Sequence, residues 1–327
     1  MSKGLAVGRL ALPPIVPEDP VTRFPISLVS ALALWPLLTP GFVHGQLPPP
    51  TECGPRLHAG ETTGTVPFPQ GDYFCPLIAD PKEPRTFASF LQGSAPAENG
   101  ELGIVGALDT EVGSIGIGDG FGLFRWAGSR PGDGVQVGIS AGVFAQFDLA
   151  TSSFDLLNAD YVVGMPLTLR RGGFSSRLRL YHQSSHLGDE FLIREEPERI
   201  NLAFESLELI LSRALRRMRV YGGGEFLFNR EPDDLDAWVA RLGAEGRLRW
   251  TDALDALAAM DVKSSQEQDW KPAWSVRVGI EAGFGVDPEH PPRRWGLLAE
   301  YYDGPSPYGQ FYREQVRFYG VGLQISL

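Results

Sequence analysis

The chain has 327 residues and a net charge of −11, because 29 lysines and arginines stand against 40 aspartates and glutamates. Such acidity argues against a nucleic-acid-binding protein, which neutralises phosphates with basic side chains. A mean hydropathy of −0.10 excludes a bundle of transmembrane helices, each of which needs about 20 apolar residues in a row. It does not exclude a membrane β-barrel, whose apolar residues alternate with polar ones.

The N-terminal part of the chain is predicted to be an export signal followed by a leader. The apolar run 26–43 follows Arg23, contains Pro36 and Pro40, and precedes small residues, as in a secretory signal peptide covering 1–45. Its basic region is unusually long, which suggests a later translation start. Residues 46–83 are rich in proline and glycine and predict a short periplasmic leader. Because export leads to an oxidising compartment, Cys53 and Cys75 either pair or remain two free thiols.

From about residue 86 to the end, apolar residues recur at every second position. In 135–148 one face carries Val135, Val137 and Ile139, whereas the other carries Gln136 and Ser140. The same alternation recurs in 238–250, 274–284 and 318–327. Successive side chains of a strand point to opposite faces, so these segments predict long antiparallel strands.

The strands have the features of a transmembrane barrel with apolar residues outside and polar residues inside. Several exceed the roughly 9–11 residues that cross a bilayer obliquely, and Trp238 and Trp250 mark the two ends of one apolar face. Residues 84–327 therefore predict an all-β barrel of about 12 strands. The last strand would be recognised by the outer-membrane insertion machinery of a diderm bacterium. The alternative is a soluble periplasmic barrel that binds a ligand, with the two faces exchanged.

Three segments interrupt the alternation and carry a family resemblance. They are Phe74-Cys-Pro-Leu-Ile-Ala-Asp-Pro81, Tyr181-His-Gln-Ser-Ser-His-Leu-Gly-Asp-Glu190 and Asp303-Gly-Pro-Ser-Pro-Tyr-Gly-Gln-Phe-Tyr312. Together they resemble the bacterial domain-of-unknown-function family numbered 1207, over about Tyr73 to Leu327. The resemblance implies a secreted or outer-membrane protein without an established activity.

The central motif contains the residue types of a hydrolytic site. His182, Ser184 and His186 share the apolar face of their strand, which also carries Leu178 and Leu180. This pattern resembles the lipid-facing His-x-Ser of outer-membrane deacylases and phospholipases, although Ser185 stands where those phospholipases have asparagine. There the histidine would act as general base for the serine, and Asp189 or Glu190 would orient it if the chain folds back. The alternative is that these polar residues only fix the turn at Gly188.

Metal binding by this motif is disfavoured, because His182 and His186 lie about 13 Å apart on a strand. The segment near the C-terminus predicts a rigid loop that either packs on the strand ends or contacts a ligand; its residues are Asp303, Gly304, Ser306, Gly309 and Gln310. No cofactor is expected.

The predicted lumen is rich in charge. Its basic members are Arg177, Arg179, Arg217, Arg219, Arg241, Arg247, Arg249 and Arg277, and its acidic members are Glu205, Glu225, Glu245, Glu281 and Glu300. Interleaved acids and bases favour salt bridges across neighbouring strands, and the alternative is a lining that selects anionic solutes. The sequence therefore predicts an outer-membrane barrel with a structural, binding or pore-like role. The alternative is a lipid hydrolase that uses His182 and Ser184.

Overall fold

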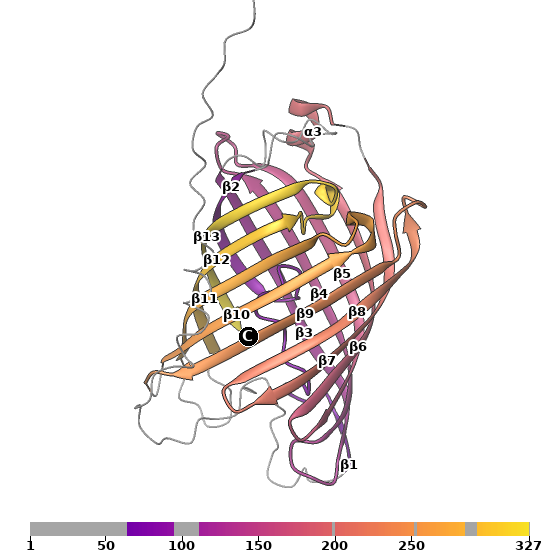
Figure 1. The fold of residues 1–327 in the computed structure, drawn as a ribbon, viewed down its shortest axis with the longest axis vertical. Helices are drawn as coiled ribbons and strands as arrows, with labels where there is room; N and C mark the ends of the chain where they lie inside the picture. Colours follow the sequence, from indigo (N-terminus) through magenta and orange to yellow (C-terminus); the bar gives the residue numbers. More distant parts are fainter. Residues whose placement is uncertain (1–63, 95–110, 198–199, 252–253, 285–292, 327) are drawn as a thin grey trace, which may run out of the picture. The chain divides into compact units, whose positions relative to one another are not determined.

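The computed structural model describes residues 64–94, 111–197, 200–251, 254–284 and 293–326. The prediction of an antiparallel β-barrel is confirmed, and its twelve strands are β2 to β13 (Figure 1). They are β2 (Thr86–Ser94), β3 (Glu111–Ala127), β4 (Gly134–Asp148), β5 (Asp155–Arg171), β6 (Phe174–Leu187), β7 (Leu202–Leu215), β8 (Met218–Glu231), β9 (Trp238–Arg249), β10 (Leu254–Ser265), β11 (Pro272–Phe284), β12 (Arg293–Pro305) and β13 (Gln315–Ser326). The predicted signal peptide and Cys53 lie outside the described residues.

Each strand pairs with its neighbours in the sequence, and the barrel closes because β13 pairs with β2. A short additional strand, β1 (Gly64–Pro67), pairs with the end of β3. Within the described part of the chain, three short helices lie in the connections: α3 (Asp189–Glu195), η1 (Gln266–Gln268) and η2 (Gly309–Phe311). None of the described helices is long and apolar enough to cross a membrane.

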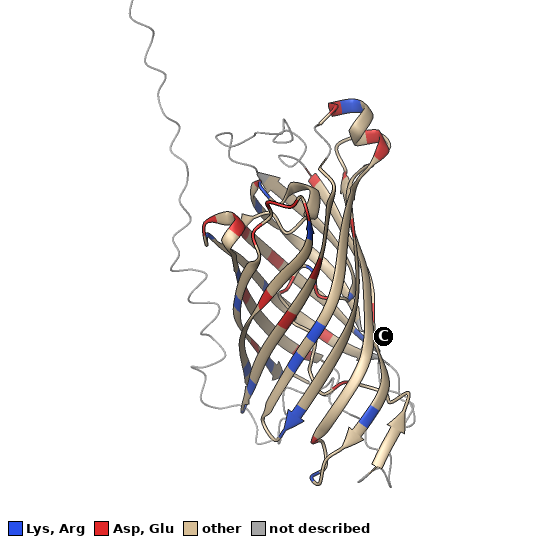
Figure 2. Ribbon diagram, turned by 90° about the vertical axis from the view of Figure 1, so that its right-hand side faces the viewer, with Lys and Arg blue, Asp and Glu red and all other residues tan. Residues whose placement is uncertain are grey.

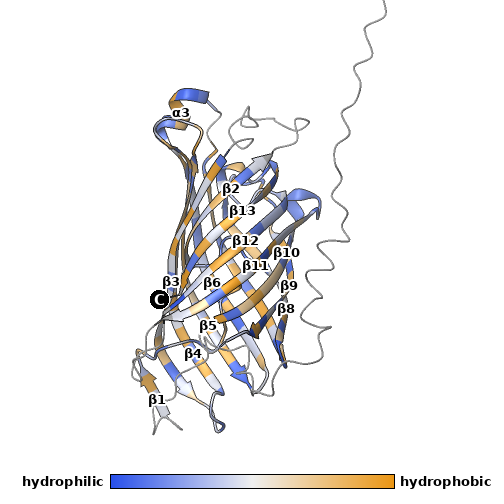
Figure 3. Ribbon diagram, turned by 90° about the vertical axis from the view of Figure 1, so that its left-hand side faces the viewer, coloured by the Kyte–Doolittle hydropathy of each residue, from blue (hydrophilic) through white to orange (hydrophobic). Residues whose placement is uncertain are grey.

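The two faces of the wall are arranged as the alternation predicts. Large apolar side chains are exposed on the outside, among them Ile117, Val163, Leu180, Leu209 and Leu242. Polar and charged side chains such as Asp160 and Glu208 point inward and are fully buried. Figure 3 shows the resulting alternation of hydrophobic and hydrophilic positions along the strands. An outer wall with this many exposed apolar residues is built to contact lipid.

The connections at the two ends of the barrel differ in length. Gly172 and Gly173 alone join β5 to β6, whereas 14 positions including α3 separate β6 from β7. Outer-membrane barrels have short periplasmic turns and longer outer loops, so we assign the end carrying α3 and η2 to the cell exterior. At that end Phe191 of α3 packs against Phe311 of η2, with ring centroids 5.9 Å apart. Both rings are fully buried, in one hydrophobic cluster with Tyr308 and Phe318.

Candidate active site on the outer wall, and the filled lumen

Most of the charged residues predicted to face the lumen lie inside the barrel, among them Arg177, Arg179, Arg219, Arg241, Glu245, Arg247, Arg277 and Glu281. Arg217 does not, because it lies exposed in the two-residue turn between β7 and β8, where strand alternation has ended. Ion pairs join neighbouring strands, for example Arg177 Nε to Glu208 at 2.9 Å and Arg219 Nη2 to Glu245 at 2.6 Å. Figure 2 shows basic and acidic positions interleaved along the strands.

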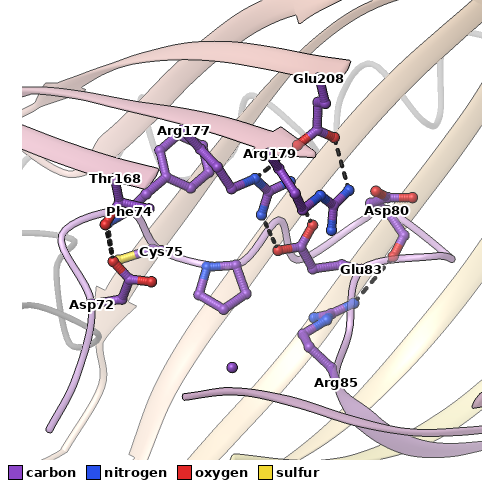
Figure 4. Close-up of polar contacts among 12 residues, drawn as sticks. Asp72, Phe74, Cys75, Asp80, Glu83, Arg85, Thr168, Arg177, Arg179 and Glu208 are labelled. Atoms are coloured by element: carbon purple, nitrogen blue, oxygen red, sulfur yellow. Dashed lines mark hydrogen bonds and ion pairs between the residues drawn. The ribbon is translucent and has the colours of Figure 1, made fainter. Parts of the chain in front are cut away.

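Residues 70–85, which we call the plug, lie within the barrel. The sequence predicts a periplasmic leader and a turn into the first strand over most of this segment. Its lack of periodicity gives no sign of burial, yet Tyr73, Leu77 and Ala79 are fully buried. Figure 4 shows the segment crossing the interior, with Arg177 and Arg179 directed toward it.

Lumen-facing arginines hold the plug by its backbone and its acidic side chains. Arg219 donates to the carbonyl oxygen of Cys75 at 2.7 Å, and Arg277 donates to that of Ile78 at 2.9 Å. The Glu83 carboxylate accepts hydrogen bonds from both terminal nitrogens of Arg177, and the one from Nη2 to Oε2 is 3.0 Å long. These charge-assisted bonds satisfy peptide groups that would otherwise be buried without partners. Many lumen arginines thus bind the plug in addition to neighbouring strands.

The plug and side chains leave little free space. One internal cavity, lined by Phe87, Arg277 and Tyr308 among others, measures about 30 Å³, which is room for one or two water molecules. This filling disfavours an open channel along the barrel axis.

The residues of the predicted C-terminal loop take two different places. Asp303 lies on the outer wall, where it accepts hydrogen bonds from Tyr301 at 2.9 Å and Arg317 at 3.0 Å. Gly304 has a φ of +137°, and a Cβ there would lie 2.5 Å from Ala273 Cα, so glycine is required. Ser306, Gly309 and Gln310 are buried in the outer mouth of the barrel.

His182, Ser184 and His186 lie on the outer face of β6, as their spacing predicts. Leu178 and Leu180 on the same face are exposed, whereas Tyr181 and Ser185 point inward and are buried. Two residues along a strand separate the Cβ atoms of His182 and Ser184 by about 6.6 Å. His186 contacts the ring of Tyr161, with centroids 5.8 Å apart.

Glu205 is the carboxylate that contacts His182. Its Oε1 lies 3.2 Å from His182 Nδ1, because the two residues are directly opposite each other on β7 and β6. The sequence-based assignment of Glu205 to the lumen is wrong: it shares the exposed face of Leu207, Leu209 and Leu211. A single acid among the leucines of this exposed face is the signal that could have identified it.

Asp189 and Glu190, the predicted orienting carboxylates, lie instead in the first turn of α3. β6 ends at Leu187, Gly188 caps α3 and the helix begins at Asp189, so the chain does not fold back along the strand. Among the described residues, no group of three or more histidines, cysteines or acids is arranged to bind a metal ion. Cys75 is disulfide-bonded, and Cys53 lies outside the described residues.

The polar group of His182, Ser184 and Glu205 lies beside aromatic residues near the outer edge of the apolar belt. Ser184 is opposite Tyr161 on β5, and Glu205 is opposite Phe228 on β8. Phe228 adjoins Phe226, whose ring lies 4.9 Å from that of Trp238. Amphipathic aromatic rings concentrate at the membrane–water interface. Tyr161 and Trp238 are residue types of this kind, and they flank the group on the exposed face of the wall.

Residues 57–327 match a protein family described as "Protein of unknown function (DUF1207)". The chain belongs to this family. The match covers most of the sequence and agrees with the resemblance carried by the three motifs. No curated protein matches this DUF1207 member.

Solved outer-membrane barrels are similar to this DUF1207 protein in structure. The outer-membrane phospholipase A from Escherichia coli aligns with a TM-score of 0.51 and 14% identity, over 75% of this chain and 91% of that chain. An active-site mutant of the same phospholipase also gives 0.51, with 13% identity over 77% and 92%. The β domain of the Bordetella autotransporter BrkA gives 0.40, with 12% identity over 75% and 99%. At these identities the likeness shows the fold alone.

Proposed function

We propose that this protein is a lipid acyl hydrolase of the outer membrane, in which Ser184 is the nucleophile, His182 the general base and Glu205 the residue that orients His182. The observation that carries the proposal is the contact between His182 Nδ1 and Glu205 Oε1, 3.2 Å apart on the lipid-facing wall. Serine, histidine and a carboxylate in this order form the machinery of acyl transfer.

The proposed chemistry follows from the two nitrogens of the imidazole. When Nδ1 carries its hydrogen and donates it to Glu205, Nε2 has a free lone pair and accepts the proton of Ser184. The serine oxygen then attacks the carbonyl carbon of a lipid ester, the C–O bond breaks, and the leaving alcohol takes the proton from His182. Water attacks the acyl-serine with the same base, which releases a fatty acid and restores the serine.

The surroundings of the group support lipid as the substrate. Val163, Leu180 and Leu207 continue the outer wall next to it and are about half exposed, so an acyl chain would find an apolar surface there. Among the structural, binding and pore-like roles that the sequence predicts, the plug disfavours the pore. The Escherichia coli barrel with a similar fold is a phospholipase A, and we propose the same class of reaction here.

The test is lipid turnover by the purified, folded protein in phospholipid–detergent micelles, with released fatty acid and lysolipid measured by mass spectrometry. We expect Ser184→Ala to abolish product formation and Glu205→Gln to lower kcat by about 100-fold or more. Ser176→Ala is the matched control, because Ser176 lies on the same face of β6 and faces Leu211 rather than a histidine. Equal product from wild type and Ser184→Ala would refute the proposal.

A further inference from the structure

A buried polar cluster lies on the inner face of the wall directly behind Ser184. Ser185, the next residue of β6, is opposite Asp160 of β5, just as Ser184 is opposite Tyr161. Asn158 and Asp160 are fully buried, and Ser185 and Gln310 are nearly so. The outer site and this inner cluster are therefore two sides of the same segment of strand.

Ser185 is held at both its side chain and its backbone. Its hydroxyl contacts Asp160 Oδ1 and Asn158 Oδ1, the latter at 2.9 Å. Its carbonyl oxygen accepts a hydrogen bond from Gln310 Nε2 at 2.8 Å. These bonds to side chains add to the backbone hydrogen bonds between paired strands, so Ser185 is fixed more firmly than an ordinary strand residue.

Asp160 connects this position to two distant parts of the chain. It forms an ion pair with Lys82 of the plug, whose side chain is mostly buried. Its Oδ2 also accepts a hydrogen bond from the backbone N–H of Gly309, with 3.0 Å between nitrogen and oxygen. Lys82 directly follows the first sequence motif, Ser185 lies in the second, and Gly309 and Gln310 lie in the third. The second and third motifs, and the residue that follows the first, thus meet behind Ser184.

We infer that Lys82, Asp160 and Gln310 form a clamp that positions Ser184 through its neighbour Ser185. One planar peptide joins Ser184 to Ser185, so holding Ser185 by its hydroxyl and its carbonyl oxygen fixes the Cα at one end of that plane and limits the movement of Ser184 at the other end. A catalytic group displaced by about 1 Å can lose about 100-fold in rate. The clamp members are positioning residues, since none of them reaches the outer face, and the inference rests on the hydrolase function proposed above.

The test compares kcat and KM of clamp variants in the same lipid assay. We expect Asp160→Asn, Lys82→Met and Gln310→Ala to lower kcat about tenfold or more while KM stays within about twofold. Glu281→Gln is the matched control, because Glu281 is an equally buried lumen acid on β11 that pairs with Arg247 at 3.2 Å, away from β6. Gel mobility with and without boiling verifies that each variant is folded, and Gln310→Ala removes the smallest number of contacts.

The outcomes separate the two proposals. Clamp variants with wild-type kcat would overturn the clamp and leave the hydrolase in place. An equal loss of kcat in Glu281→Gln would also overturn the clamp, because any change to a buried lumen charge would then have the same effect. A folded wild type that neither turns over lipid nor reacts with a fluorophosphonate would overturn the hydrolase and the clamp together.

Discussion

Replacing Glu208 by glutamine should destabilise the barrel strongly, because this side chain is fully buried between two arginines. Its Oε1 accepts from Arg177 Nε and its Oε2 from Arg179 Nη2, both at 2.9 Å. Glutamine has one acceptor oxygen, and its amide nitrogen would face an arginine donor. Arg177 retains Glu83 as a partner, whereas Arg179 Nε and Nη1 already have no hydrogen-bond partner among the described residues.

Breaking one side of a buried ion pair costs about 3–5 kcal/mol. With a urea m-value of about 3 kcal/mol per molar, the unfolding midpoint should fall by about 1–1.7 M. The assay is equilibrium unfolding of the refolded protein in detergent, followed by tryptophan fluorescence and gel mobility. Glu196→Gln is the control, because Glu196 is exposed beside α3. A Glu208→Gln midpoint equal to that of the control would show that water screens the lumen charges and would refute the reasoning.

Two further predictions address the wall and the lumen. Leu209→Arg places a charge in the middle of the exposed apolar face of β7. It should make folding into lipid vesicles less favourable by about 2–4 kcal/mol. Vesicle folding unaffected by this change would contradict a lipid-facing wall. In planar bilayers the intact protein should show no large conductance steps, because the plug and the loop at η2 fill the lumen. Large, stable steps from the folded wild type would contradict that filling.

The wall of the barrel could be predicted because its signal is local. Alternation assigns Ile139 to lipid and Ser140 to the lumen without knowledge of any partner strand, and both assignments hold in the structure. The same local signal places His182 and Ser184 together on the outer face. It could not place Glu205 beside His182, because that contact depends on the register between two strands separated by α3 and its loop.

The interior could not be predicted because its contacts are non-local. Arg219 and the carbonyl of Cys75 are 144 positions apart, and Gln310 and Ser185 are 125 apart. The plug has no periodicity, since it is irregular backbone whose polar groups are satisfied by arginines from several strands. The sequence motifs indicate that Asp80, Ser185 and Gln310 are unusual, but not that their segments meet in the lumen.

The proposed function requires Ser184 to be an activated nucleophile on the lipid-facing wall. The most direct measurement is covalent labelling of the folded protein with a fluorophosphonate, in which the serine oxygen bonds to phosphorus and fluoride leaves, followed by peptide mass mapping. We expect a single adduct on Ser184 that is lost in His182→Ala and strongly slowed in Glu205→Gln. An unlabelled Ser184 in the folded wild type, or labelling at the same rate without His182, would contradict it.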